Sequence, residues 1–287
     1  MDSRERRERF RAVLSGDECV FPASVFDPLS ARIAEDLGFE VGMLAGSIAS
    51  LVVLGAPDVV VLTLDELAQQ VRRICRAGDL SLLVDADHGY GNALNAMRTV
   101  EELETAGVAA LSIEDTRLPP GGSSPELISL EEGVGKIRAA LSARQDPSLV
   151  ILGRTGAARI AGIGEALDRA KAYERAGVDG IFLVGLESVD ELEAARAELR
   201  VPLLLGGGPP ELTDAARLAE HGVRIALQGH APFHAALKAT YDTLRALRQG
   251  TPPRELRESV APRALVERLS RAADYAHWQS EFVKGKS

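Results

Sequence analysis

The sequence predicts an α/β protein folded as a closed (β/α)8 barrel, and two observations support this. Eight short runs rich in apolar residues recur along the 287 residues, most of them continuous, as is typical of parallel strands buried on both faces. Amphipathic helical patterns separate these runs, which fits eight β-α units better than an open doubly wound sheet. No Gly-x-Gly-x-x-Gly follows the first run, which disfavours a dinucleotide fold. The expected strands span residues 19–25, 41–46, 81–87, 109–115, 149–155, 180–185, 202–208 and 224–229.

Capping chemistry predicts the helix boundaries. Ser/Thr-x-x-Glu, the spacing of a capping box, opens expected helices at Thr63, Ser129 and Ser188. Glycine then ends a helix before the next strand at Gly38, Gly78, Gly107, Gly177 and Gly222.

Two helical segments lie outside the repeat. Residues 3–15 are expected to form an N-terminal helix and 262–283 a C-terminal helix, so that residues 1–287 make one barrel domain with a helical tail from about 252. The tail carries aromatic residues that pack either on a partner subunit or on the chain's own barrel. These are Tyr275, Trp278 and Phe282.

Composition limits the class of partner. The net charge of −9 disfavours nucleic acid and anionic membranes as partners, while 46% hydrophobic residues suffice for a large core. The cysteines, Cys19 and Cys75, form neither a disulfide framework nor a zinc pattern. The charged N-terminus does not resemble a signal peptide, and no apolar run approaches the ~20 residues that cross a bilayer. We therefore expect a soluble cytoplasmic protein.

Asp85 and Asp87 follow the third expected strand and are the first candidates for a metal site. Residues two apart on a strand share a face, and two carboxylates on one face repel each other unless a cation lies between them. Oxygen ligands of this kind suit Mg²⁺ or Mn²⁺. A solvated turn is the alternative interpretation. Asp58, ahead of another helix, either caps that helix or approaches the metal through water.

Other polar residues follow neighbouring strands, whose carboxyl ends form the active-site face of a barrel. Ser47 follows the second strand, and the strand register directs Glu114 rather than Asp115 into the barrel mouth. Arg154 ends an apolar run, where it needs either a structural carboxylate or a bound one. His230 either serves the site or caps the last barrel helix. The set predicts a site for a hard cation and an anionic ligand.

These residues lie in motifs that resemble the isocitrate lyase/phosphoenolpyruvate mutase superfamily over roughly residues 20–245, and within it the oxaloacetate decarboxylase group. The superfamily motifs are Asp27-Pro28-Leu29-Ser30-Ala31, Gly46-Ser47-Ile48-Ala49-Ser50, Asp85-Ala86-Asp87-His88-Gly89-Tyr90-Gly91, Ile113-Glu114-Asp115 and Glu132-Gly133-Val134-Gly135-Lys136-Ile137. The closer match lies in residues 92–100, Gly229-His230-Ala231 and Lys238-Ala239-Thr240-Tyr241-Asp242.

The resemblance implies a barrel whose last helix is exchanged between subunits, giving a homotetramer built as a dimer of dimers. It also implies one Mg²⁺, with Mn²⁺ as the alternative. Asp85 matches the direct ligand, and Asp87 and Glu114 act largely through bound waters. The family's substrate-contacting positions match Ser47, Arg154 and His230.

The loop at residues 116–125 separates activities within this superfamily. It lacks the lysine and cysteine of the carbon–carbon lyases and the lysine and asparagine of a phosphonomutase. It is also short, and Gly156 stands where relatives usually have Asn or Asp. Retro-aldol cleavage is slow without a positioned acid or base, whereas carbon dioxide leaves without a proton from the enzyme.

We therefore expect a Mg²⁺-dependent decarboxylase, a lyase that converts oxaloacetate to pyruvate and carbon dioxide through a metal-stabilised enolate. Arg154 and His230 are the expected catalytic residues, and His230 either contacts the departing carboxylate or helps to protonate the enolate. A lyase or hydrolase of the same superfamily, acting on a substituted malate, methylisocitrate or oxaloacetate, is the first alternative. A non-catalytic barrel that binds a dicarboxylate is the second.

Overall fold

The computed structural model describes residues 2–117 and 125–283, which form two compact units, residues 1–229 and 230–287. Within the described part of the first unit, eight parallel strands pair in sequence order. This confirms the predicted succession of strands, although most strands are shorter than expected. Their bounds are β1 Ala23–Ser24, β2 Val41–Leu44, β3 Ser81–Asp85, β4 Ala110–Glu114, β5 Val150–Thr155, β6 Gly180–Leu183, β7 Leu203–Leu205 and β8 Val223–Ala226.

The chain just ahead of β1 closes the sheet into a barrel. Val20 forms a parallel bridge with Ile225 of β8. Its N–H donates to the Arg224 carbonyl (2.9 Å), and its own carbonyl accepts from the Ala226 N–H (3.1 Å). With the sheet edges joined, the strands are buried on both faces, which explains their continuous apolar sequence.

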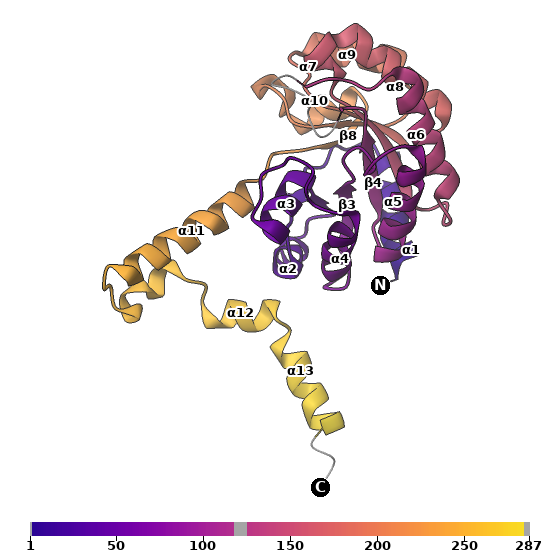
Figure 1. Ribbon diagram of the computed structural model, residues 1–287. Coiled ribbons are helices and arrows are strands. Elements are labelled where there is room, and N and C mark those ends of the chain that lie inside the picture. Colours follow the sequence, from indigo (N-terminus) through magenta and orange to yellow (C-terminus); the bar gives the residue numbers. More distant parts are fainter. Residues whose placement is uncertain (1, 118–124, 284–287) are drawn as a thin grey trace. The chain divides into compact units, whose positions relative to one another are not determined.

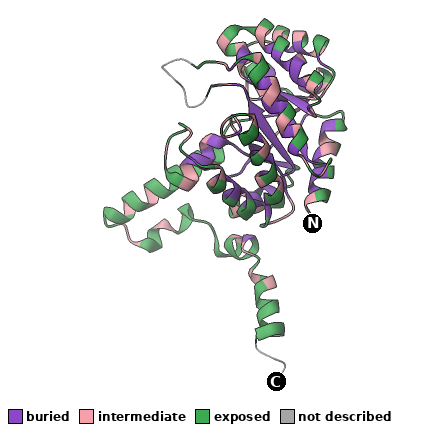
Figure 2. Ribbon diagram, turned by 45° about the vertical axis from the view of Figure 1, so that its right-hand side comes forward, coloured by how far each residue is buried: buried purple, intermediate pink, exposed green. Residues whose placement is uncertain are grey.

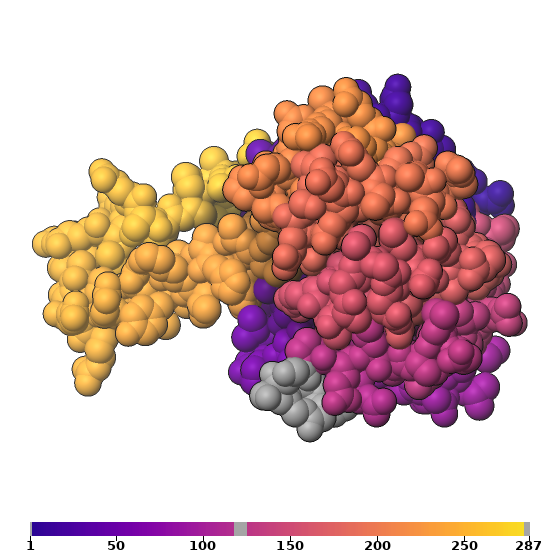
Figure 3. Space-filling model, turned by 90° about the horizontal axis from the view of Figure 1, so that it is seen from above, coloured from indigo at the N-terminus to yellow at the C-terminus, as the bar shows by residue number. Residues whose placement is uncertain are grey.

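Helices alternate with the strands and cover the outside of the sheet (Figure 1). Figure 2 shows buried strands beneath helices whose outer faces are exposed, and in Figure 3 successive β-α units follow one another around the first unit. The helices between the strands are α2 Pro28–Asp36, α3 Gly46–Leu54, α4 Leu64–Cys75, α5 Ala93–Ala106, α6 Leu130–Ala143, α7 Ala157–Ala161, α8 Ile163–Ala176, α9 Val189–Glu198, the 3-10 turn η1 Pro210–Leu212 and α10 Ala215–Glu220.

The predicted capping signals are present. Thr63 and Glu66 form a reciprocal capping box at α4, and Ser129 and Ser188 cap α6 and α9. Gly107 ends α5 in the left-handed region at φ 99°, which a side chain would disfavour. Gly78, the predicted end of α4, lies beyond the helix, which already ends at Cys75.

The second unit is helical but has almost no core of its own; Leu269 is the buried hydrophobic residue among its described part. The expected continuous helix over 262–283 is wrong. Arg271 adopts φ 58°, a left-handed conformation that cannot continue an α-helix, and separates α12 from α13. The elements are α11 Ala231–Arg248, η2 Pro253–Ser259, α12 Arg263–Leu269, α13 Ala272–Trp278 and the π-helical turn η3 Gln279–Val283. Among the residues described in either unit, no helix is long and apolar enough to cross a membrane.

The N-terminal helix α1 Ser3–Ser15 has the predicted bounds and packs on the first unit through Phe10, which is fully buried. Arg7 on the same helix donates to the Val108 carbonyl (3.0 Å) and to Asp146 Oδ2 (2.8 Å). The Ser148 hydroxyl and N–H donate to the other oxygen of Asp146. The Ser148 hydroxyl, with Arg7, lowers the pKa of Asp146 to about 2.

We predict a pH-dependent contribution of Asp146 to stability. Because its pKa is lower in the folded than in the unfolded chain, its charge stabilises the fold above about pH 4, and this stabilisation is lost as the pH falls toward 2. The difference in unfolding free energy between wild type and Asp146→Asn, measured by urea unfolding, should be largest at pH 5 to 7 and shrink toward pH 2. A difference that grows on acidification would contradict the assignment.

Candidate functional site

The carboxyl ends of β3, β4 and β5 bring Asp85, Glu114 and Arg154 together. Glu114 is paired in register with Arg154 across the adjacent strands. The guanidinium donates from Nη1 to Asp85 Oδ2, and its Nη2 lies 3.2 Å from Glu114 Oε2. Both carboxylates are buried, so this ion pair lies in a low-dielectric environment where an unpaired charge would be costly.

The Nε–H of Arg154 is a donor that neither Asp85 nor Glu114 uses. Its Nε is buried without a hydrogen-bond partner in the described part of the chain. Its guanidinium carbon lies 5.5 Å from the ring centroid of Phe182 on β6. Burial lowers the pKa of Arg154, but Asp85 and Glu114 raise it by more, so the arginine stays charged. An anionic ligand oxygen would satisfy the Nε–H.

Asp87 lies against the start of α3. A Cβ at Gly46 would overlap the Asp87 carboxylate, so only glycine leaves room for this carboxylate beside Ser47. Asp87 itself has φ 46°, an uncommon conformation for a residue other than glycine, and its N–H donates to Asp85 Oδ1 (3.1 Å). Burial, and then repulsion from Asp85 and Glu114, raises the pKa of Asp87 well above its usual value.

Asp58 and Glu114 belong to the same electrostatic cluster. Burial and the charge of Asp85 raise the pKa of Asp58, while Arg154 opposes the shift. Burial raises the pKa of Glu114 to about 7 against the attraction of Arg154. The second interpretation of Asp58, an approach to the acidic site, is therefore the one that its charge interactions favour. Its sequence position alone carried no signal that distinguished it from a helix cap.

The loop after β3 contains polar groups that the sequence did not single out. Tyr90 has φ 58°, and its hydroxyl is buried without a partner among the described residues, as is Nδ1 of His88. Burial, and then the charge of Lys136, lowers the pKa of His88 to about 4, so this imidazole is neutral at pH 7. Lys136 on α6 donates to the His88 carbonyl (3.1 Å) and so supports the loop.

The structure does not place three further predicted features in this cluster: His230, the loop after β4 and a set of converging metal ligands. His230, directly ahead of α11, belongs to the second unit, and its role stays a prediction. Residues 118–124 of the loop after β4 lie outside the described residues. Across the residues that are described, no group of three His, Cys, Asp or Glu side chains converges as direct metal ligands do; the guanidinium of Arg154 lies between Asp85 and Glu114 instead.

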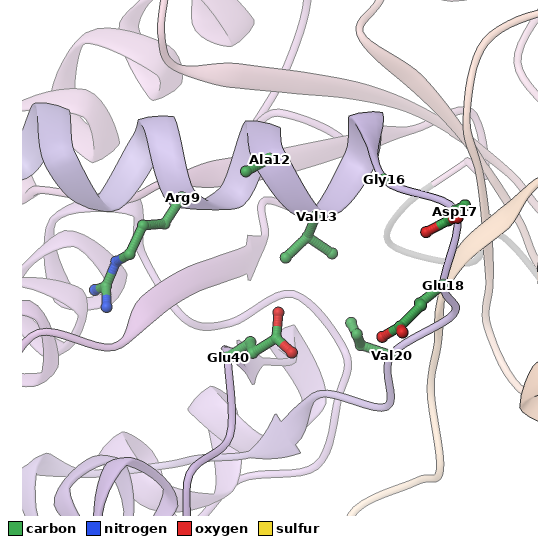
Figure 4. A pocket seen from close by; sticks show the side chains of 8 residues that line it. All are labelled: Arg9, Ala12, Val13, Gly16, Asp17, Glu18, Val20 and Glu40. Atoms are coloured by element: carbon green, nitrogen blue, oxygen red, sulfur yellow. The ribbon is translucent and has the colours of Figure 1, made fainter.

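A surface pocket of about 350 Å³ lies beside α1, away from these strand ends (Figure 4). None of the predicted site residues lines it, and its wall combines acidic, basic and apolar side chains. Its lining residues are Arg9, Ala12, Val13, Gly16, Asp17, Glu18, Val20 and Glu40.

Comparison with known proteins assigns the chain to a family. The model of the phosphoenolpyruvate phosphomutase family matches residues 10–248, which include the acidic cluster and Arg154. The chain belongs to the phosphoenolpyruvate phosphomutase family. This confirms the superfamily that the motifs predicted.

Family members with similar sequences carry the name of the predicted activity. The chain is 57% identical over 276 residues to a protein named oxaloacetate decarboxylase from Bradyrhizobium diazoefficiens, with 96% of each chain covered. It is also 57% identical over 275 residues to a protein of the same name from Rhodopseudomonas palustris, with 95% of each covered.

Solved structures of the family share the fold over nearly the whole chain. A phosphonopyruvate hydrolase in complex with oxalate and Mg²⁺ superposes with a TM-score of 0.87 at 29% identity, covering 99% of this chain and 100% of that one. An oxaloacetate acetylhydrolase in complex with 3,3-difluorooxalacetate gives a TM-score of 0.86 at 28% identity, with 100% of both chains covered.

We predict that Arg154→Met destabilises the fold by about 3 kcal/mol, because it leaves the buried carboxylates of Asp85 and Glu114 without their cation. Adding Asp85→Asn and Glu114→Gln to the variant should recover most of this loss, since both uncompensated charges are then removed. Urea unfolding at pH 7 without divalent cations measures all forms. Additive losses in the triple variant would show that the three side chains do not form one interacting set.

Proposed function

We propose that this protein catalyses the Mg²⁺-dependent decarboxylation of oxaloacetate to pyruvate and carbon dioxide. The observation that carries the proposal is Arg154, whose guanidinium pairs with Asp85 and Glu114 and whose buried Nε–H lacks a partner among the described residues. Such a group suits a small dianionic α-keto acid. The name shared by relatives that are 57% identical over nearly the whole chain supports the same reaction.

The donor set at the strand ends fits a divalent cation. Asp58, Asp85, Asp87 and Glu114 all offer oxygen, the ligand that Mg²⁺ and Mn²⁺ prefer, and one arginine does not balance four carboxylates. A cation here would offset part of the burial and repulsion penalties. Asp85 would hold the ion directly, and Asp87 and Glu114 would orient its bound waters.

Arg154, Ser47 and His230 have separate roles in the proposed reaction. Arg154 pairs with a substrate carboxylate through its unpartnered Nε–H, and Ser47 at the start of α3 donates a hydrogen bond at the same end. When bound, the cation supplies positive charge at the ketone oxygen, where negative charge develops as carbon dioxide leaves. His230 contacts the departing carboxylate or helps to return a proton to the carbon.

The thiols of this chain do not suit the carbon–carbon lyase alternative. Cys19 and Cys75 are both buried, and burial raises the pKa of each thiol to about 11. A catalytic cysteine needs an accessible thiol of lowered pKa. Structural relatives include an oxaloacetate acetylhydrolase and a 2,3-dimethylmalate lyase. Product analysis separates these reactions, because only decarboxylation yields pyruvate and carbon dioxide with no further carbon fragment.

We further propose a homotetramer, a dimer of dimers with an exchanged last helix. Exposed apolar side chains form a stripe along each of two helices: Leu29 and Ile33 on α2 with Leu37 directly after its end, and Leu237, Tyr241 and Leu244 on α11. Each stripe follows helical spacing and would be covered in an assembly. A cytoplasmic location also remains a prediction.

The predicted activity can be measured directly. Purified protein with Mg²⁺ should release pyruvate from oxaloacetate, followed with lactate dehydrogenase, at a rate well above Mg²⁺ alone, because free metal ions also decarboxylate this substrate. A chelator and Asp85→Ala should each remove the excess rate, since both remove the cation from the site. His230→Ala should lower kcat.

Asp168→Ala is the matched control, because Asp168 is an exposed carboxylate on α8, and it should keep the full rate. Equal rates with and without the wild-type protein would refute the proposed function. Oxalate and acetate in place of pyruvate would identify a hydrolase.

Light scattering after size exclusion should give the wild type four times the mass of one chain. Leu237→Asp combined with Leu244→Asp should yield smaller species, because charges on the α11 stripe oppose its burial in an interface. A wild-type monomer, or a tetramer unaffected by both substitutions, would contradict the proposed helix exchange.

A further inference from the structure

A second buried network lies directly behind Glu114. Its neighbour Asp115 faces away from the acidic cluster and is 1% exposed. One carboxylate oxygen of Asp115 accepts from the Tyr173 hydroxyl (2.8 Å) and from Arg169 Nη1 (3.3 Å), both on α8. The sequence offers no reason for burying this carboxylate, since only Glu114 was expected to serve the site.

The same network connects the end of β4 to the segment that precedes α6. Arg169 Nη2 donates to the Ile128 carbonyl (2.9 Å), while the Ile128 N–H donates to the Asp115 carbonyl (2.9 Å). Arg169 is held in turn by Glu165 one turn earlier (2.7 Å). The end of β4 is therefore fixed through both the side chain and the backbone of Asp115.

Tyr173 also supports the next strand. It is 1% exposed and packs against Gly153, the residue before Arg154, where an added Cβ would lie 3.0 Å from the Cβ of Tyr173. Its hydroxyl lies against Gly133 of α6, and a Cβ there would overlap it. Glycine at position 133 therefore leaves room for the hydroxyl, and glycine at position 153 allows close packing of the tyrosine on β5.

We infer that Tyr173 is a positioning residue for the active site, which holds Glu114 through Asp115 and Arg154 through Gly153 so that the two meet across β4 and β5. One side chain thus contacts the immediate neighbours of both partners of an ion pair 3.2 Å long. The role rests on the proposed function, because it is defined by what Glu114 and Arg154 do for the cation and the substrate. Groups that hold metal ligands in place typically change metal affinity or activity by about 10- to 100-fold, and Tyr173, which acts through the neighbours Asp115 and Gly153, should lie at the lower end of this range.

Tyr173→Phe removes the hydroxyl and keeps the ring packing. We expect an approximately 10-fold weaker affinity for Mn²⁺, measured by electron paramagnetic resonance, and a similar loss of kcat for oxaloacetate. Asp115→Asn should produce losses of the same kind. The double variant should be little worse than either single one if Tyr173 acts on Glu114 through Asp115.

Gly133→Ala and Gly135→Ala form a matched pair on α6. Both substitutions raise helix propensity, but only the first places a Cβ against the Tyr173 hydroxyl, because nothing lies within 4 Å of a Cβ at Gly135. Gly133→Ala should weaken Mn²⁺ binding and Gly135→Ala should not. Ser81→Ala removes another buried hydroxyl hydrogen bond, to the Arg6 carbonyl at the opposite strand ends, and controls for general loss of stability.

Wild-type Mn²⁺ affinity and kcat in folded Tyr173→Phe would overturn the inference, and so would equal losses in Ser81→Ala. A wild-type protein that binds Mn²⁺ but does not decarboxylate oxaloacetate would refute the proposed function alone. The Mn²⁺ titrations would then still decide the role of Tyr173.

Discussion

The pairing of one guanidinium with two buried carboxylates is the constraint on which this active-site face depends. Arg154 on β5 reaches Glu114 on β4 and Asp85 on β3, so the register of three consecutive strands determines whether the charges meet. Burial of an unpaired carboxylate carries a large desolvation penalty. The guanidinium offsets this penalty only when it lies close to each carboxylate in good geometry. The Nε–H of Arg154, which has no partner among the residues that the structure describes, remains available to a ligand within that arrangement.

Packing behind the charges preserves this geometry. Tyr173 supports the strand ends from outside the barrel, while Lys136 holds the loop after β3 through the His88 carbonyl. That loop keeps Asp87 and Tyr90 at positive φ, a conformation that persists only where surrounding contacts enforce it and that is typical of functional sites. The helices therefore do more than cover the sheet, since their buried polar groups hold the site residues in place.

Much of the fold could be predicted from the sequence because it follows from local chemistry. Continuous apolar runs indicate strands buried on both faces, and Glu114 could be directed inward by strand alternation. Asp87 could not, because its left-handed backbone ends the alternation after Asp85. Long-range contacts were also beyond the sequence: nothing in its spacing shows that Asp58 approaches Asp85 or that Tyr173 reaches Asp115. The break at Arg271 likewise interrupts a pattern that reads as helical throughout.

We propose that the charges around Arg154 form the site for both a divalent cation and a dicarboxylate. A crystal structure of the protein with Mn²⁺ and oxalate, using anomalous scattering to locate the metal, tests it most directly. We expect one anomalous peak among Asp85, Asp87 and Glu114, with the oxalate in contact with Arg154. A peak elsewhere, or oxalate bound away from Arg154, would contradict it.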